Sequence, residues 1–381
     1  MEKKRFNKVR RINFEVIFEG YGCINFDSIE QVDFDTAIGL ISKDNSNFYH
    51  NNKKLNNIKL AKKNIRINSD NKPEFHIKVS NETIKHNMFK KTMDKNSPNL
   101  MTVPHILYSA LAHKDCILRG YLNTQRGDIV LKKSSPITIT DAEEIGPWRS
   151  AISMDFHSRS GQKESKEGKG KYDPNDTSIY KDENVGGAIT YKSEGAIDVN
   201  ELRFISADPI YDRCAINVDG GSNESIYLDS LRKSMCNFSP EFKYYYLDGA
   251  ITQDEWAERG ILLNDDSVDM LIKRAFENIL EIKDYRNKAY FKTKSLKVTV
   301  CCDGMAPETI DITLDNIDSF YFECLTTYVE TNEEKILNNK KNAEEISAKI
   351  RKERKEKKEK EDRKGRNDLY RNTEDVCEKL F

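Results

Sequence analysis

The chain has 381 residues, of which 37% are hydrophobic and 33% charged, and its formal net charge is −1. This length suits one large domain with insertions or two domains, and a near-neutral chain can bind nucleic acid only through local clusters of charge. No run of eighteen apolar residues occurs, and the basic N-terminus leads into a strand-like pattern, so we predict neither a membrane span nor a signal peptide.

Eight cysteines are scattered along the chain without a CxxC pair. This spacing argues against a zinc ribbon or a disulfide framework, and it fits a reducing compartment. We therefore expect a cytoplasmic protein.

The first half of the chain predicts one strand and one clear helix. Apolar residues alternate from Ile12 to Phe18, which is typical of a half-buried strand. Residues 42–74 are rich in Asn and Lys and predict a loop with one short helix. The stretch 98–122 predicts a single helix, with Thr102 as its cap and Pro104 in its first turn.

The second half alternates strands and helices. Residues 266–285 have a strong helical apolar period, and residues 295–302 alternate as a strand. This order favours an α+β fold of ferredoxin-like type with large insertions, in a single elaborated domain over residues 1–330. Residues 331–381 predict a charged helical or disordered tail. The remaining segments are strands at 135–144, 188–206, 212–219 and 242–251 and a helix at 223–235.

Motifs for catalysis, metals and cofactors are missing from the sequence. The six histidines form no HExxH pattern, and "GKGK" at 168–171 lacks the spacing of a phosphate-binding loop. Asp27 and Asp33 follow the first strand and could act as acid or base, but acids in turns are far more often solvated or capping residues. We predict no catalytic residue, no metal site and no cofactor.

Three basic clusters remain, and we assign them to loops. Cationic side chains neutralise phosphates, and interleaved aromatics such as Phe89 stack on unpaired bases. Lysine-rich loops also simply keep proteins soluble, so no single cluster is decisive. The clusters contain Lys85, Lys90, Lys91 and Lys95; Arg119, Arg126, Lys132 and Lys133; and His157, Arg159 and Lys163.

The stretch "HSRSGQKESKEGKGKYDPND" at 157–176 interrupts two segments that look packed. It has almost no large aliphatic side chains, so we expect it to be a long loop. Its basic residues precede its acidic ones, which suits a mobile arm for an anionic partner. A tolerated surface loop is the alternative.

The motifs "GYGCINFD", "MTVPHILYSALAHKDCILRGYL", "PITITDAE" and "GAIDVNELRFIS" occur in this order between residues 11 and 320. Together they resemble the repeated backbone subunit of CRISPR Cascade complexes, a RAMP-superfamily protein, nearest the compact variant of subtype I-F. The resemblance implies an RRM-like palm with an extended β-hairpin thumb, here residues 155–188. It also implies a non-catalytic subunit that stacks head to tail on guide RNA (crRNA), with target DNA and other Cascade subunits as partners.

The expected contacts with RNA combine the basic clusters with this resemblance. The expected RNA-binding residues are Tyr21, Lys90, Lys91, His113, Arg119, Arg126, Lys132, His157, Arg159 and Lys163. The resemblance implies that apolar thumb residues wedge between bases, and these are Tyr172, Ile179, Tyr180 and Val185.

Two alternatives stay open. The first is an endoribonuclease of the same superfamily that processes CRISPR RNA, for which His113 or His157 could exchange protons. The second is a structural or interaction protein that binds no RNA and uses the charged tail as an arm.

Overall fold

The computed structural model describes part of the chain, and every structural statement below concerns that part. The described residues are 3–21, 29–31, 49–50, 53–54, 58–61, 63–67, 69–95, 104–123, 130–146, 151–162, 172–208, 214–217, 222–248, 257–286, 289–331 and 352.

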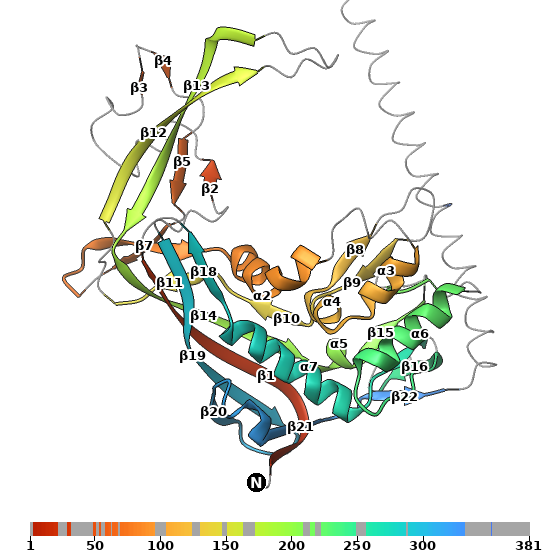
Figure 1. Ribbon diagram of the computed structural model, residues 1–381. Helices are drawn as coiled ribbons and strands as arrows, with labels where there is room; N and C mark the ends of the chain where they lie inside the picture. The colour runs from red at the N-terminus through yellow and green to blue at the C-terminus, as the bar shows by residue number, and fades with distance from the viewer. Residues whose placement is uncertain are drawn as a thin grey trace, which may run out of the picture. The chain divides into compact units, whose positions relative to one another are not determined.

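A long first strand, β1 (Lys4–Tyr21), lies at the centre of a ten-stranded sheet (Figure 1). It pairs antiparallel with β14 (Ala188–Asp198) on one side and with β19 (Ala289–Cys302) on the other. Its N-terminal half also pairs in parallel with β21 (Phe320–Cys324). The alternation from Ile12 to Phe18 places alternate side chains in the core, so the predicted strand is confirmed.

The other strands of this sheet extend it on both sides. Their order is β18-β19-β1-β14-β11-β7-β6, with β10, β20 and β21 paired off this path. These strands are β6 (Lys63–Ile67), β7 (Pro73–Val79), β10 (Ile137–Ile139), β11 (Ala142–Glu144), β18 (Lys283–Arg286) and β20 (Glu308–Ile312). A short 3-10 turn, Ile317–Ser319, leads into β21.

Helix α7 (Asp265–Leu280) packs on β19 and β21 and covers one face of the sheet. Asn264 caps it by accepting a hydrogen bond from the Ser267 backbone N–H. Its apolar stripe is buried, and Phe276 meets Phe322 edge to face at 6.0 Å between ring centroids. The predicted helix is therefore confirmed.

The prediction of a single helix over 98–122 is wrong, because the described residues of this range form two helices. These are α3 (Pro104–Leu111) and α4 (Lys114–Arg119). The break falls at His113, which has an extended backbone and accepts the Asp115 backbone N–H on its ring at 3.3 Å. A new N-terminus with its own cap therefore replaces continuous helical bonding. Helix α6 (Ser222–Ser234) packs against α3.

Helix α2 (Asn81–Lys95) lies where we expected a basic loop. Ile84, Met88 and Phe89 are buried along it, at helical spacing. The loop assignment is wrong because the lysines between these residues hide a narrow apolar stripe.

Three further expectations are also wrong in the described residues. The range 42–74 contains short strands: β3 (Tyr49–His50), β4 (Lys53–Lys54), β5 (Ile58–Ala61) and β6. The range 188–206 is not one strand, because Asp198 caps the short helix α5 (Val199–Arg203) between β14 and β15 (Phe204–Ser206). Residues 214–217 form no strand.

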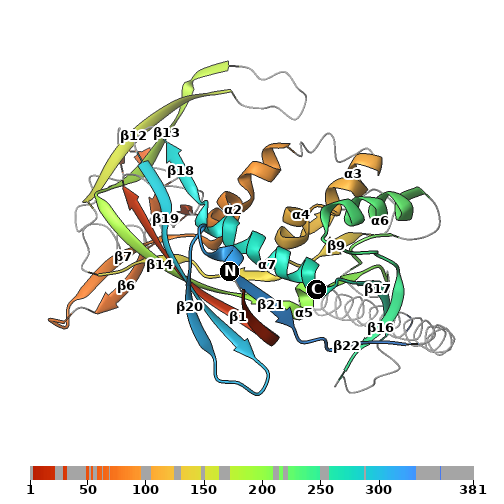
Figure 2. The same ribbon diagram turned by 60° about the horizontal axis from the view of Figure 1, so that its bottom comes forward.

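The polar stretch at 157–176 falls on two paired strands, β12 (Ala151–Gln162) and β13 (Tyr172–Gly186), and not on one long loop (Figure 2). Backbone hydrogen bonds between the strands satisfy the polar main chain without an apolar core. β13 also pairs with β5, which pairs with β2 (Ile29–Gln31). Residues 163–171 lie outside the described residues.

The chain divides into two compact units. The first comprises residues 1–241 and 261–326, and the second comprises 242–260 and 327–381. In the second unit β16 (Lys243–Leu247) pairs with β17 (Glu258–Leu262) and with β22 (Tyr328–Glu330). A single domain to residue 330 with a tail beyond it stays a prediction.

Candidate nucleic-acid interface

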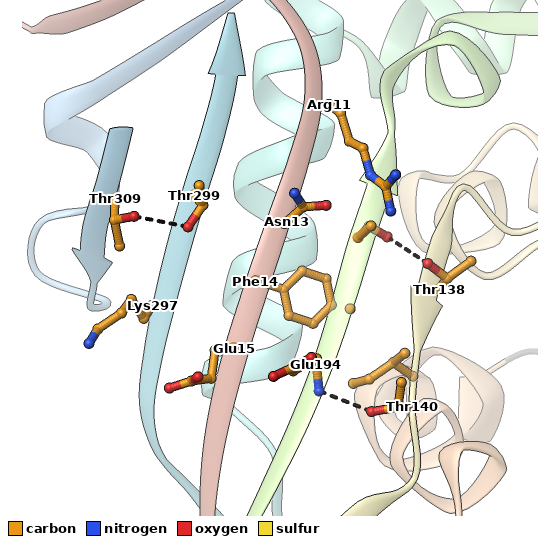
Figure 3. Close-up of a pocket in the computed structure, with 13 residues that line it drawn as sticks. Arg11, Asn13, Phe14, Glu15, Thr138, Thr140, Glu194, Lys297, Thr299 and Thr309 are labelled. Carbon is orange, nitrogen blue, oxygen red and sulfur yellow. Dashed lines mark hydrogen bonds between the residues drawn. The ribbon is translucent and has the colours of Figure 1, made fainter. Parts of the chain in front are cut away.

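The face of the sheet formed by the odd-numbered residues of β1 carries polar side chains that are only partly covered. Directly paired residues share a face, so Asn13 lies beside Thr299 and Ala196, and Glu15 lies beside Lys297 and Glu194. A groove runs over this face across β20, β19, β1, β14 and β10 (Figure 3). Its lining residues are Arg11, Asn13, Phe14, Glu15, Thr138, Ile139, Thr140, Glu194, Gly195, Ala196, Lys297, Thr299 and Thr309.

The groove has a tightly packed floor. Phe14 pairs with Gly195 across β1 and β14, and its ring is buried. A Cβ atom on Gly195 would lie 2.2 Å from Phe14 Cζ and 2.4 Å from the Thr138 carbonyl oxygen. Glycine at 195 therefore lets the Phe14 ring and β10 approach β14 closely.

Two cations in the groove are available to an anion. Both carboxylates, Glu15 and Glu194, are bound by the Lys192 ammonium, at 2.7 and 2.9 Å. The hydrogen bonds that Lys192 donates to these carboxylates raise its pKa above the ordinary value, so it stays charged. Arg11 and Lys297 have no ion-pair partner among the described residues, so both are able to form charged hydrogen bonds with a phosphate group.

A second groove continues from the first along β11 and β7, sharing Thr140 and Glu194 with it. Here Glu143 receives Arg66 at 2.5 Å and Lys78 at 2.8 Å. Arg66 and Lys78 are already neutralised by Glu143. We therefore expect an anion to bind more weakly in this second groove than at Arg11 and Lys297.

At the C-terminal end of β1 the same face carries two tyrosines. Tyr21 is 51% exposed, and its ring is nearly parallel to that of Tyr290, with centroids 6.3 Å apart and planes 14° apart. One step back along the strands, Lys292 binds Glu19 at 2.5 Å. The hydrogen bond from Lys292 lowers the pKa of Glu19.

The expected RNA-binding residues do not gather in one place. Of those whose side chains are described, only Tyr21 lies on the open sheet face. Lys90 is exposed on α2, Arg119 is exposed in the last turn of α4, and Lys132 is half-buried on β9 (Leu131–Lys133), which pairs with β8 (Tyr121–Asn123).

Three expectations from the basic clusters need correction. Lys133 is 6% exposed on β9 and donates to the Glu201 carbonyl oxygen at 3.0 Å, so it is a buried lysine and not a phosphate contact. Phe89 is 2% exposed, so it is a core residue and cannot stack on a base. Lys85 lies on a helix, not a loop, and its partial burial lowers its pKa. His113 is exposed, and its ring serves as the cap of α4.

The remaining candidates stay predictions. Only the backbone is described for Lys91 on α2, for His157 and Arg159 on β12, and for Tyr172, Ile179, Tyr180 and Val185 on β13. Arg126, Lys163, Asp27 and Asp33 lie outside the described residues.

Sequence reasoning missed Arg11 and Lys297. Each sits at a polar position of an alternating strand, which predicts exposure but not a site. Only the pairing of β1 with β19 brings them onto one groove.

The described residues contain no group of three His, Cys, Asp or Glu side chains that could hold a metal ion. In that same part of the chain, no helix is long and apolar enough to cross a membrane.

Comparison with known protein families shows that this chain is a CRISPR-associated protein of type I-Fv. The matching family model is described as "Type I-Fv CRISPR-associated protein Cas7fv-like" and spans residues 8–306. The chain belongs to this Cas7fv-like family, which confirms the resemblance drawn from the four motifs. The sequence matches no curated protein.

Two solved structures are similar at low identity. One is a chain of a "CRISPR RNA-guided surveillance complex", with 8% identity over 90% of this chain and 84% of that chain, at a TM-score of 0.31. The other is a chain of a "CRISPR RNA-guided surveillance complex, pre-nicking", with 7% identity over 77% of each chain and the same TM-score of 0.31. A likeness this distant carries no argument about geometry.

Proposed function

We propose that this protein is a non-catalytic, crRNA-binding backbone subunit of a CRISPR surveillance complex in the cytoplasm. The observation that carries the proposal is the family match over residues 8–306. In this proposal several copies stack head to tail along one guide RNA, beside other Cascade subunits, and the assembled complex meets target DNA. A head-to-tail contact is heterologous and does not close, so it suits a filament on RNA.

We further propose that the ten-stranded sheet and its helices act as an RRM-like palm, and that the β12–β13 hairpin acts as the thumb. The open sheet face supports a palm role, because Arg11 and Lys297 can neutralise backbone phosphates without base preference. The hairpin supports a thumb role, because a two-stranded ribbon reaches outward without needing a core of its own.

The absence of catalysis is part of the proposal. His113, a candidate base for the endoribonuclease alternative, accepts a hydrogen bond from the Asp115 backbone N–H, which employs one ring nitrogen in capping. Replacing Asp27 or Asp33 with Ala should leave any RNase activity of the complex unchanged. A clear loss of cleavage would overturn the non-catalytic assignment.

The first experiment is to purify the full chain at moderate salt, measure its absorbance ratio at 260 and 280 nm, and extract and sequence any bound RNA. We expect nuclease-resistant RNA of uniform length in a large assembly. Discrete products from repeat-containing RNA would favour the endoribonuclease alternative. A monomer that carries no RNA and binds no added single strand at low salt would overturn the proposal and favour the structural alternative.

A further inference from the structure

The C-terminal end of β1 carries an aromatic cluster that the packing of the sheet does not require. Tyr21 is 51% exposed, whereas Phe18, on the opposite face of the same strand, is fully buried against Phe291. Exposing a tyrosine ring to water is unfavourable in free energy, and an exposed ring contributes little to the packing of the core. Its position therefore suggests a surface that is covered when a partner binds.

The strand register extends this cluster into a row. Tyr21 pairs with Tyr290 on β19, and Tyr290 pairs with Tyr285 on β18, so three tyrosine positions lie in line across three strands. On the other side, Tyr21 pairs with Ala188 on β14, which is exposed. A small side chain beside Tyr21 leaves room for a planar group next to its ring.

The surroundings of the row suit a nucleotide. Lys292 lies 6.0 Å from the centroid of the Tyr290 ring and also binds Glu19, so a cation is fixed beside the aromatics. Ala188 follows the end of β13 by two residues, so the row lies at the chain position where the β12–β13 hairpin returns to the sheet.

We propose that Tyr21 and Tyr290 form a stacking platform for one unpaired RNA base per subunit. The inference rests on the proposed function, and it assigns Tyr21, one of the expected RNA-binding residues, to a base. Aromatic side chains on an open sheet stack bases with little sequence preference, because every base has a π-face. The platform should therefore accept any base at its position in the guide.

The test uses the full chain and single-stranded RNAs that carry one 2-aminopurine at successive positions, because stacking on an aromatic ring quenches its fluorescence. Wild-type protein should quench one position per subunit footprint. Tyr21→Ala should abolish that quench and weaken binding about tenfold, whereas Tyr21→Phe should preserve both, since the phenyl ring still stacks. Tyr246→Ala, which removes a half-buried tyrosine from β16, is the matched control and should behave as wild type.

The outcomes separate the two levels of the proposal. Wild-type protein that binds no RNA would overturn both the function and the platform. RNA binding that is unchanged in Tyr21→Ala, with the same quench, would overturn the platform alone. Loss of large assemblies in Tyr21→Ala while the quench persists would also overturn it, because Tyr21 would then contact a neighbouring protein. Thermal melting checks that each variant is folded.

Discussion

Phe14 and Gly195 face each other across β1 and β14, and the Phe14 ring fills the space that a side chain at position 195 would need. The Thr138 carbonyl oxygen closes the same space from β10, 2.4 Å from where a Cβ atom would lie. The ring can turn, but the carbonyl belongs to a paired strand and cannot move without breaking the pairing. Gly195 is therefore a packing requirement of the groove floor.

Gly195→Ala should lower the free energy of unfolding by about 1–3 kcal/mol, the usual cost of overpacking a core. Urea unfolding measures this change. Thr309→Ala, on the rim of the same groove, is the control and should stay within about 0.5 kcal/mol of wild type. An unchanged Gly195→Ala protein would mean that β10 can move away from β14.

Asp115 joins α4 to α7. Its buried carboxylate accepts Arg274 Nε at 2.9 Å and Nη2 at 3.1 Å, and it also accepts Asn278 Nδ2 at 2.9 Å. The hydrogen bonds that Arg274 donates to Asp115 raise the pKa of the guanidinium, so Arg274 stays charged.

Asp115→Ala should destabilise the protein by about 3 kcal/mol, because it leaves the arginine and the amide without their acceptor. Glu277→Gln is the matched control. It weakens only the partly exposed (i, i+3) pair with Arg274, which is worth about 0.5 kcal/mol or less. Equal effects in calorimetry would contradict a special role for Asp115.

The sequence predicts β1 and α7 well because each buries one whole face. Ile12 and Phe18 mark a period of two, and Val268 and Phe276 belong to a helical stripe that is not interrupted. Helix α2 and the β12–β13 hairpin escape such reasoning for different reasons. The apolar residues of α2 are few and embedded among lysines, and the hairpin forms by backbone pairing that needs no apolar pattern.

The candidate site is less predictable than the fold because it depends on which strands pair. Arg11 and Lys297 meet on one groove only through the register of β1 with β19, and the same register sets Tyr290 beside Tyr21. No local pattern connects positions so far apart along the chain. Tyr21 is one of the expected RNA-binding residues because it stands in the family-like motif "GYGCINFD", and its role in binding stays a prediction.

The double substitution Arg11→Gln and Lys297→Gln should weaken the binding of all single-stranded RNAs about equally, because both side chains are proposed to contact phosphates and not base edges. Losing two phosphate contacts should reduce the slope of log K against log salt by about 1.4. Fluorescence anisotropy at several salt concentrations measures both quantities. Arg232→Gln with Lys233→Gln, on exposed positions of α6, removes the same charge and should leave the slope unchanged. A change of preference for one sequence would instead indicate base reading.

The ion pair of Glu19 with Lys292 should make stability depend on acid pH. Lys292 lowers the pKa of Glu19 below its ordinary value of 4.5, so the folded state binds its proton less readily than the unfolded state does. The stabilisation is complete above about pH 4.5 and is lost as the pH falls through the lower folded pKa.

Glu19→Gln should therefore have a shallower fall in Tm below about pH 4.5 than wild type. The effect should be small, because the two side chains are 31% and 42% exposed, and 1 M salt should shrink it further. Identical Tm profiles for the two proteins at low salt would show that the pair contributes nothing.

The β12–β13 register allows the proposed thumb to be shortened without disturbing its base. Ser158 pairs with Ile179, so residues 159–178 can be replaced by an Asn-Gly turn that joins these two positions as a tight hairpin. We expect the shortened protein to melt near the wild-type Tm, since the hairpin is a separate sheet from the ten-stranded one, but to lose nuclease-resistant RNA of uniform length.

A second, full-length variant with Lys163, Lys166, Lys169 and Lys171 changed to Ser distinguishes the charge of the hairpin from its length. If it retains protected RNA while the shortened protein does not, the length of the hairpin is what closes over the guide. If the shortened protein protects RNA as well as wild type does, the assignment of the hairpin as a thumb is wrong.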